Sequence, residues 1–281
     1  MISIVVPAFN ESAVIARTLD AMTSGANRSE LDVIVVCNGC TDNTASIARS
    51  FGPPVRVIET GVPSKSHALN LGDQAAVCFP RLYVDADVMI GINTIRKLAQ
   101  RLGRGDVHVV APTAHIEFST CSWPVRAYGN IRSFLPSAKE GVGGSGVYAL
   151  SEIGHRRIRE FPNLIADDGY VRIHFAAEER ETVASAMSTV FYPATLKHLI
   201  ATKTRSHYGS FELARAFPGL WKNKGKSNTA ALLELFKYPW LWHKLLIYCF
   251  VMSIAKVRAR RQLYKKIRTW QRDESSRSAA K

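Results

Sequence analysis

The sequence contains few cysteines for its length, and their number is odd. Five cysteines are spread over 281 residues, at positions 37, 40, 78, 121 and 249. A chain this long can bury a large core without covalent cross-links, and scattered cysteines do not indicate a disulfide framework. Met1 is followed at once by an apolar strand, without the charged region and cleavage pattern of a signal peptide. We therefore expect a reducing, cytoplasmic location without a secretory signal.

Long hydrophobic runs are also scarce. The main one, residues 245–255, spans eleven residues. As a helix it extends about 16 Å, about half of a ~30 Å hydrocarbon core. An extension back to Tyr238 reaches spanning length only by burying His243 and Lys244. Aromatic residues precede the run and a basic tail follows it, so we expect an interfacial helix; a helix packed on the core is the alternative.

Positive charge is concentrated at the end of the chain. The net charge is +14, and residues 256–281 carry ten basic and two acidic side chains, which leaves +6 on the other 255 residues. Such a tail indicates an acidic partner, either anionic phospholipid or nucleic acid. No nucleic-acid-binding motif appears in the body of the chain, so we expect peripheral attachment to the cytoplasmic face of a membrane.

The first 90 residues alternate between apolar strands and helical patterns. Strands are expected at residues 2–7, 31–36, 55–58 and 81–90, with a helix after each of the first three. This order is typical of an α/β protein with a doubly wound, mostly parallel, Rossmann-like sheet. Ligands of such sheets bind beyond the carboxyl ends of the strands.

Two carboxylates, Asp85 and Asp87, interrupt the fourth strand. Side chains alternate along a strand with period two, so both can point the same way while Val84 and Val88 pack inward. Two carboxylates directed at one point repel each other unless a cation lies between them. Mg²⁺ or Mn²⁺ characteristically takes one or two protein carboxylates and completes its shell with water and substrate phosphates. The alternative is a strand end with two solvated aspartates.

Four segments, in this order, resemble the nucleotide-sugar-binding motifs of family 2 glycosyltransferases of the GT-A fold. They are Val-Val-Pro-Ala-Phe-Asn-Glu at 5–11, Asn-Gly-Cys-Thr-Asp-Asn-Thr at 38–44, Lys65 with Ala-Leu-Asn-Leu-Gly at 68–72, and Asp-Ala-Asp at 85–87. The resemblance extends over residues 2–204. It implies a GT-A fold, a nucleoside diphosphate sugar as donor and a divalent metal on the diphosphate.

The resemblance also implies roles for single residues. Pro7, Phe9 and Glu11 border the nucleoside, Asn38 contacts the base, Lys65 lies beside the nucleotide, and Asp85 with Asp87 holds the metal. The chain departs from the family at Cys37-Asn38, where Asp-Asp is common. Asparagine both donates and accepts, whereas an aspartate only accepts, so the selectivity for the base is not defined by the resemblance.

The cysteines at 37 and 40 permit another interpretation. Two cysteines separated by two residues at a strand-to-helix turn resemble a redox dithiol. A zinc site is not indicated, because no second Cys or His pair follows at ligand spacing.

A second acidic pair, Asp167-Asp168, lies in an apolar neighbourhood before a helical pattern. It resembles the acidic motif in which family 2 enzymes carry their catalytic base, and that alignment places the base at Asp168. Removing the proton from an acceptor hydroxyl requires such a group. Asp167 is expected to support the loop at the start of the helix. A purely structural cap is the alternative for both.

Three further segments are candidates for the site. The glycine-rich residues 141–150, with Gly144 as our candidate, can form a wall for the donor sugar or a flexible loop. Residues 203–209 occupy the place of a segment that closes over the donor, where Arg205 or His207 can reach the diphosphate. Residues 118–134 hold Trp123, Tyr128 and Arg132, and form either an acceptor groove or an ordinary helix.

The sequence thus predicts an inverting, metal-dependent glycosyltransferase that moves one sugar to a hydroxyl of a lipid-linked or cell-surface glycan. Residues 1–210 form the catalytic domain, and residues 211–281 form a helical, membrane-associating region. The Gln-x-x-Arg-Trp pattern of processive synthases is missing, which argues against polymerisation. A polyprenyl-phosphate glycosyltransferase is the alternative enzyme, and a basic nucleic-acid-binding protein is the alternative class.

Overall fold

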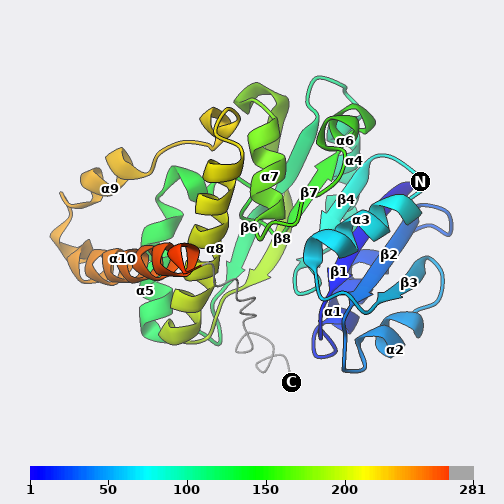
Figure 1. The fold of residues 1–281 in the computed structure, drawn as a ribbon, viewed down its shortest axis with the longest axis horizontal. Helices are drawn as coiled ribbons and strands as arrows, with labels where there is room; N and C mark the ends of the chain where they lie inside the picture. The colour runs from blue at the N-terminus through cyan, green and yellow to red at the C-terminus, as the bar shows by residue number, and fades with distance from the viewer. Residues whose placement is uncertain (266–281) are drawn as a thin grey trace.

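The computed structural model describes residues 1–265, which form an α/β protein around one eight-stranded sheet (Figure 1). The strands are β1 Ile2–Ala8, β2 Leu31–Asn38, β3 Val55–Thr60, β4 Arg81–Val84, β5 Met89–Ile90, β6 Val109–Glu117, β7 Val147–Leu150 and β8 Arg180–Phe191. The α-helices of this described part are α1 Ile15–Thr23, α2 Thr44–Arg49, α3 Lys65–Ala75, α4 Ile92–Leu102, α5 Trp123–Ser133, α6 Glu152–Ile158, α7 Asp167–His174, α8 Leu196–Ala216, α9 Thr229–Leu235 and α10 Trp242–Tyr264.

The strands follow the order β3-β2-β1-β4-β7-β6-β8-β5. β3, β2, β1 and β4 are mutually parallel, and they are the four strands expected from the sequence. Beyond β4 the sheet is mixed, because β7 runs antiparallel to both β4 and β6, while β8 is parallel to β6. The predicted α/β class with a doubly wound parallel half is therefore confirmed.

Both faces of the parallel half are buried, which explains its continuous apolar strands. On β1, Ile4 and Val6 pack with α1, α2 and α4, whereas Val5 between them packs with α3, α6 and α7. All three side chains are fully buried. Burial of one such side chain stabilises the fold by roughly 1.5–3 kcal/mol, so the strand is held from both sides.

The packing of α3 on the sheet depends on a glycine. A Cβ atom added to Gly72 would lie 2.4 Å from Cγ1 of Val5, which is too close for any other residue without a shift. Gly72 therefore lets α3 lie directly on β1. This close contact brings Lys65, the first residue of α3, to the carboxyl ends of β1 and β4.

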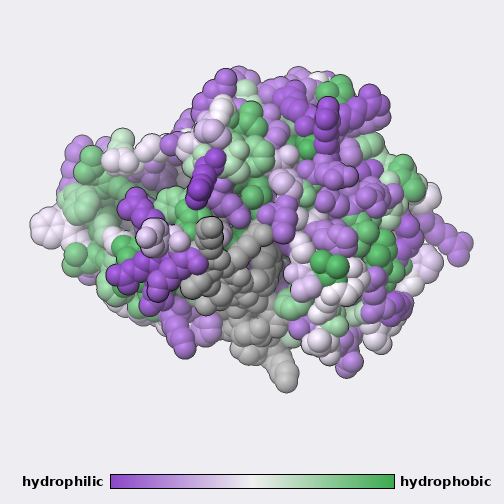
Figure 2. Space-filling view, viewed as in Figure 1, coloured by the Kyte–Doolittle hydropathy of each residue, from purple (hydrophilic) through white to green (hydrophobic). Residues whose placement is uncertain are grey.

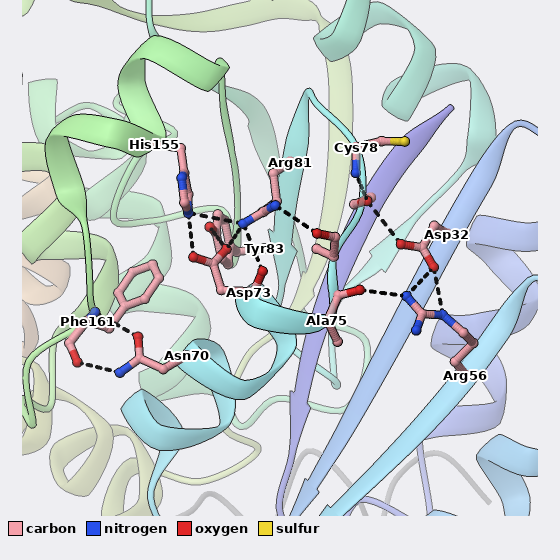
Figure 3. Close-up of polar contacts among 12 residues, drawn as sticks. Asp32, Arg56, Asn70, Asp73, Ala75, Cys78, Arg81, Tyr83, His155 and Phe161 are labelled. Atoms are coloured by element: carbon pink, nitrogen blue, oxygen red, sulfur yellow. Dashed lines mark hydrogen bonds and ion pairs between the residues drawn. The ribbon is translucent and has the colours of Figure 1, made fainter.

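A buried polar network fixes the start of β4 (Figure 3). The carboxylate of Asp73 on α3 accepts hydrogen bonds from Arg81 Nη1 at 2.5 Å and from the Tyr83 hydroxyl at 2.6 Å, and it contacts His155 of α6. Partnered charges of this kind are costly to break because the remaining group stays buried. The network joins α3, β4 and α6 at the end of β4 opposite to Asp85.

A third apolar cluster joins α5, α8 and α10. In α10, Leu245, Tyr248, Val251, Ala255 and Ala259 are buried, at the spacing of one helical face. Tyr248 stacks on Tyr128 of α5 at 5.0 Å between ring centroids. Helix α10 thus extends well beyond the predicted run 245–255, and the division that we expected at residue 210 lies within α8.

Candidate active site

A cavity of about 340 Å³ opens at the carboxyl ends of β1, β2 and β4. It is lined by most of the residues that the sequence singled out for the site: Pro7, Phe9, Glu11, Asn38, Lys65, Asp85, Asp87, Gly144, Asp167, Asp168 and Arg205. These residues come from segments up to about 200 positions apart in the sequence. The sequence motifs therefore converge on one place, as expected for ligand sites of doubly wound sheets.

The first two motifs brace each other. Asn10, with a positive φ of 54°, places its side-chain oxygen 2.7 Å from the backbone N–H of Thr41. The N–H of Glu11 donates to the Thr44 hydroxyl at 2.8 Å, and that of Ser12 donates to Asp42 at 3.1 Å. The polar residues of the 38–44 motif thus hold the loop that follows β1, which carries Phe9 and Glu11 into the cavity.

Asn38, the last residue of β2, is only 4% exposed and lines the cavity. Its side-chain oxygen is buried and has no hydrogen-bond partner among the described residues. A buried acceptor without a partner is costly, so it indicates a donor supplied by a ligand. The N–H groups of a nucleobase are donors of this kind, which agrees with the contact expected at Asn38.

Asp85 and Asp87 lie in a turn and not on one strand, so the alternation argument was wrong. β4 ends at Val84, and the Val88 N–H donates to the Asp85 carbonyl at 3.1 Å to close the turn. The Thr18 hydroxyl of α1 holds the Ala86 carbonyl at 2.8 Å. Both carboxylates nevertheless line the cavity.

Lys65 links two acidic residues of the site. Its ammonium lies 2.7 Å from Asp85 and 2.9 Å from Asp167. Burial disfavours the charged amine, but the two carboxylates more than offset this effect and hold the pKa of Lys65 above its ordinary value. Lys65 is therefore a fixed positive charge at neutral pH, placed between the two acidic motifs.

The second acidic pair divides into a buried and an accessible carboxylate. Asp167 is 7% exposed, bound by Lys65 and 3.4 Å from the Tyr148 hydroxyl. Burial raises the pKa of Asp167 to about 6, with Lys65 acting against it and Asp168 with Asp85 adding to it. Asp168 is half-buried, lines the cavity, and accepts the Gly169 N–H at 2.6 Å. This placement leaves Asp168 available to a substrate and engages Asp167 with the protein.

The donor set at Asp85 and Asp87 fits a hard divalent cation that shares its shell with a substrate. Within residues 1–265, no group of three or more His, Cys, Asp or Glu side chains is arranged to hold a metal by itself. Two carboxylates at an open cavity match the Mg²⁺ or Mn²⁺ sites in which phosphates and water complete the coordination.

The glycine-rich segment contributes to the lining of the cavity. Gly143, Gly144 and Gly146 all line the cavity. Gly146 has a φ of +66°, and a Cβ there would lie 2.5 Å from Val88 and 3.3 Å from Asp85 Oδ2. A Cβ on Gly143, with a φ of +93°, would lie 3.7 Å from Asp168 Oδ2. Gly146 thus lies close to Asp85 of the first acidic motif, and Gly143 lies close to Asp168 of the second. A glycine-rich sequence does not by itself specify this proximity.

The far wall consists of α5, α8 and the end of β8. Residues 203–209, which occupy the place of a segment that closes over the donor, lie inside α8, where Arg205 reaches the cavity. His207 is not among the lining residues: it stacks on Phe211, and burial lowers its pKa to about 4. Residues 123–133 form the helix α5, from which Arg132 lines the cavity and Trp123 does not.

Sequence reasoning missed further polar lining residues, among them Arg172, Thr202 and Ser210, and it did not single out Lys203 or Ser206 within residues 203–209. Their sequence positions carry only a helical spacing, and nothing local shows which face meets the site.

The two cysteines that resemble a redox dithiol, Cys37 and Cys40, lie near the site, because Cys37 directly precedes Asn38. Cys37 is buried, and both cysteines are free thiols. A hydrogen bond with Cys37, opposed by burial, lowers the pKa of Cys40 to about 7.

Solved structures share this architecture. The mannosyltransferase PcManGT from Pyrobaculum calidifontis, in complex with GDP-Man and Mn²⁺, is 20% identical with a TM-score of 0.62, covering 99% of this chain and 85% of that chain. Glucosyl-3-phosphoglycerate synthase from Mycobacterium tuberculosis, in complex with Mn²⁺, UDP and glucosyl-3-phosphoglycerate, is 20% identical with a TM-score of 0.53, covering 76% and 79%. At this identity the likeness shows the fold alone.

Sequence comparison identifies the family. None of the curated proteins compared with the chain matches it. Residues 3–149, more than half of the chain, match the sequence model described as "Glycosyl transferase family 2", and this range contains the braced loops, Lys65 and both carboxylates of the metal candidate. The resemblance noted from the motifs is thereby confirmed: the chain belongs to glycosyl transferase family 2.

Proposed function

We propose that this family 2 glycosyltransferase, which acts on nucleotide sugars, transfers a single sugar to an acceptor hydroxyl with inversion at the anomeric carbon. The observation that carries the proposal is the convergence of both acidic motifs and the orphaned Asn38 acceptor on one cavity. Asn38 supplies a site for a base, and Asp85 with Asp87 supplies ligands for a metal. Asp168 supplies an accessible carboxylate.

Residues at the ends of β1 and β2 bind the nucleoside in this proposal. Pro7, Phe9 and Glu11 form one side of the nucleoside site, and the oxygen of Asn38 accepts a hydrogen bond from the base. Asp85 and Asp87 hold Mg²⁺ or Mn²⁺, which neutralises charge on the leaving diphosphate when bound. Mn²⁺ is present with the nucleotide or nucleotide sugar in both structural relatives described above.

Asp168 acts as the general base. As the acceptor oxygen bonds to the anomeric carbon, its proton passes to the carboxylate of Asp168, and the bond from that carbon to the diphosphate oxygen breaks on the opposite face. One carboxylate used in this way accelerates a reaction by typically 10²–10⁴-fold. Asp167 holds Lys65 and the start of α7, which positions Asp168 beside it.

A polyprenyl phosphate is the second candidate acceptor. Its phosphate oxygen is already ionised and needs no base, so Asp168 would then contribute little. Arg132 and Lys203 on the far wall favour an acidic group on the acceptor. The nucleic-acid-binding alternative rests on the basic tail, of which residues 266–281 lie outside the described part of the chain.

We also propose that the enzyme is attached peripherally to the cytoplasmic face of an anionic membrane, near a glycan or glycolipid acceptor. Leu246 and Phe250 of α10 are 72% and 52% exposed, on a face away from α5 and α8, and Trp240 just before the helix is 66% exposed. In the same view as Figure 1, apolar and hydrophilic surface lie side by side over α9 and α10 (Figure 2). Apolar anchors beside basic residues suit a membrane surface.

The same stretch passes one test for a membrane span. Within residues 1–265, one helical stretch, Pro239–Tyr264, is long and apolar enough to cross a bilayer by length and composition alone. Its buried face is engaged with α5 and α8, and Lys244 donates to Asn130 of α5 at 3.0 Å. These contacts favour insertion of the exposed face only.

A screen of nucleotide sugars for metal-dependent thermal stabilisation tests the proposed function. A ligand at 100 times its Kd stabilises the native state by about 2.7 kcal/mol, so the correct donor raises Tm measurably. We expect one nucleoside diphosphate sugar to do so with Mg²⁺ or Mn²⁺ and to lose the effect in chelator. If no nucleoside diphosphate sugar stabilises the protein under either condition, the proposal is wrong.

A further inference from the structure

Two cations on the far wall of the cavity lack an acidic partner. Lys203 of α8 and Arg132 of α5 both line the cavity, and neither forms an ion pair within residues 1–265. The Lys203 ammonium lies over the rings of Tyr128 and Tyr192, 5.7 and 5.6 Å from their centroids. The positive charge of Arg132 opposes the rise that burial causes in the pKa of Tyr192. Both cations therefore lie close to Tyr192, which also lines the cavity.

The electrostatics of this pair are unfavourable without a counter-ion. Burial, together with the positive charges of Arg132 and Arg205, lowers the pKa of Lys203 to about 7, and no carboxylate acts against this shift. Asp85 and Asp167, by contrast, are both bound by Lys65. Arg132 and Lys203 are both half-buried, and neighbouring charges of one sign repel each other unless an opposite charge joins them. Such clusters are characteristic of binding sites.

The position of the pair separates it from the proposed nucleoside site. The walls come from opposite ends of the longest axis of the molecule: β1, β2 and β3 lie at one end, and α5, α8 and α10 lie at the other (Figure 1). The candidates for nucleoside binding extend from the ends of β1 and β2, whereas Lys203 and Arg132 extend from α8 and α5. Asp168, on α7, also lines the cavity.

We infer that Arg132 and Lys203 form a binding site for a phosphate group on the acceptor. The inference rests on the proposed function, because it assigns the far wall to the acceptor. A phosphate accepts several hydrogen bonds and carries up to two negative charges, so it satisfies both cations at once. The guanidinium of Arg132 can bind it through two parallel hydrogen bonds, and Lys203 contributes a point charge. The phosphate belongs either to a soluble acceptor or to the headgroup of a lipid.

Calorimetric titration of inorganic phosphate into the full-length protein, with Mg²⁺ and saturating GDP or UDP, tests the site. Lys203→Met keeps a similar side-chain length among the tyrosines and removes the charge, and Arg132→Gln provides a second variant. We expect each to weaken phosphate binding at least about 10-fold, the value of a hydrogen bond to a charged group. Lys197→Met, at an exposed position of α8, is the matched control and should leave phosphate affinity unchanged.

Two results would overturn the inference. The first is a phosphate affinity that is unchanged in both variants. The second is a loss of GDP or UDP affinity as large as the loss of phosphate affinity, because this would assign the two cations to the donor. If no nucleoside diphosphate binds the wild-type protein with Mg²⁺ or Mn²⁺, the proposed function fails. Phosphate titrated alone then still decides the anion site: a loss of affinity in both variants supports it, and no change overturns it.

Two further titrations distinguish the sources of the phosphate. One uses glycerol 3-phosphate in solution, and the other uses vesicles that contain a polyprenyl phosphate, with polyprenol vesicles as the reference. A soluble acceptor predicts a loss of affinity on Lys203→Met in the first titration alone. A lipid acceptor predicts tighter binding to the phosphate vesicles than to the polyprenol vesicles, with that difference removed by Lys203→Met. If Lys203→Met alters neither titration, the inference is wrong.

Discussion

The ammonium group of Lys65, the first residue of α3, lies 2.9 Å from a carboxylate oxygen of Asp167, the first residue of α7. The pair joins two helices that are about 100 residues apart in sequence, at the point where the cavity opens. Burial raises the pKa of Asp167 to about 6, so its ionised form depends on Lys65. The ion pair therefore sets the positions of two neighbouring candidates, Asp85 and Asp168.

Loss of Lys65 should destabilise the protein through Asp167. In Lys65→Met the Asp167 carboxylate stays buried without its partner, and breaking a buried pair in this way costs about 3–5 kcal/mol. Adding Asp167→Asn removes the unpaired charge, so the double variant should regain much of this free energy of unfolding. Urea denaturation of the four proteins measures the coupling. If the two changes are additive within about 0.5 kcal/mol, the pair makes no specific contribution.

The metal assignment predicts a conditional loss of binding. Asp87→Ala removes one of two candidate ligands, so it should abolish sugar transfer and weaken nucleoside diphosphate binding only when Mg²⁺ or Mn²⁺ is present. Calorimetry with and without chelator measures this difference. Full activity of the variant, or of the wild type in excess chelator, contradicts a metal at this site.

The base assignment predicts a separation of binding and turnover. Asp168→Asn keeps the shape of the side chain and removes its basicity, so kcat should fall by about 10²–10⁴ while nucleotide affinity stays nearly unchanged. Asp167→Asn provides the comparison, because Asp167 is bound to Lys65 and is expected to act on positioning. A larger loss of kcat in Asp167→Asn would reverse the assignment, and a small loss in Asp168→Asn would favour an acceptor that is already ionised.

The buried network at Asp73 predicts sensitivity to acid. Burial alone would raise the pKa of Asp73, but hydrogen bonds from His155, Tyr83 and Arg81 lower it below its ordinary value of 3.8. Its contribution to stability is therefore present above that ordinary pKa and is lost as pH falls towards the pKa of the folded state. Asp73→Asn should be less stable at neutral pH and should lose less stability on acidification. Denaturant unfolding from about pH 7 to about pH 3 measures both slopes, and parallel slopes contradict the prediction.

The sequence predicts the first half of this fold well because parallel strands covered on both faces are continuous apolar runs. β1 and β2 follow this rule, and the polar ends of β1, β2 and β4 place the site. The strand expected at 81–90 ends at Val84, although the sequence becomes apolar again at residues 88–90. Val88 is buried there in a turn that the Thr18 hydroxyl holds, and β5 pairs with the distant β8. These interactions are tertiary, so local alternation does not reveal them.

The second half is less predictable for the same reason. The basic, aromatic residues 203–209 resemble a segment that closes over the donor, and in the structure they lie in a helix that Thr195 caps and that packs on α10 and α5. Lys203 lies against Tyr128 of α5, 75 positions earlier in the sequence, and against Tyr192 just after β8. A helical spacing gives no information on which face meets a cavity until the partner helices are known.

The exposed face of α10 predicts binding to anionic vesicles. Leu246 and Phe250 are exposed, whereas Leu245 and Val251 pack on the neighbouring helices, so the first two can be changed without opening the core. Full burial of such side chains stabilises by roughly 1.5–3 kcal/mol each. The double change Leu246→Ser and Phe250→Ser should therefore weaken vesicle binding by about 100-fold or more, with nucleotide affinity unchanged.

The control for this experiment is a pair of equally exposed apolar residues elsewhere, changed as Val77→Ser and Ile153→Ser. These substitutions should leave vesicle sedimentation unaltered, because neither residue lies on α10. Binding should also strengthen with anionic lipid content and weaken as salt screens the basic residues, since the Debye length falls to about 8 Å at 0.15 M. If the full-length protein stays in the supernatant with anionic vesicles at low salt, α10 serves the core alone and the anchor proposal fails.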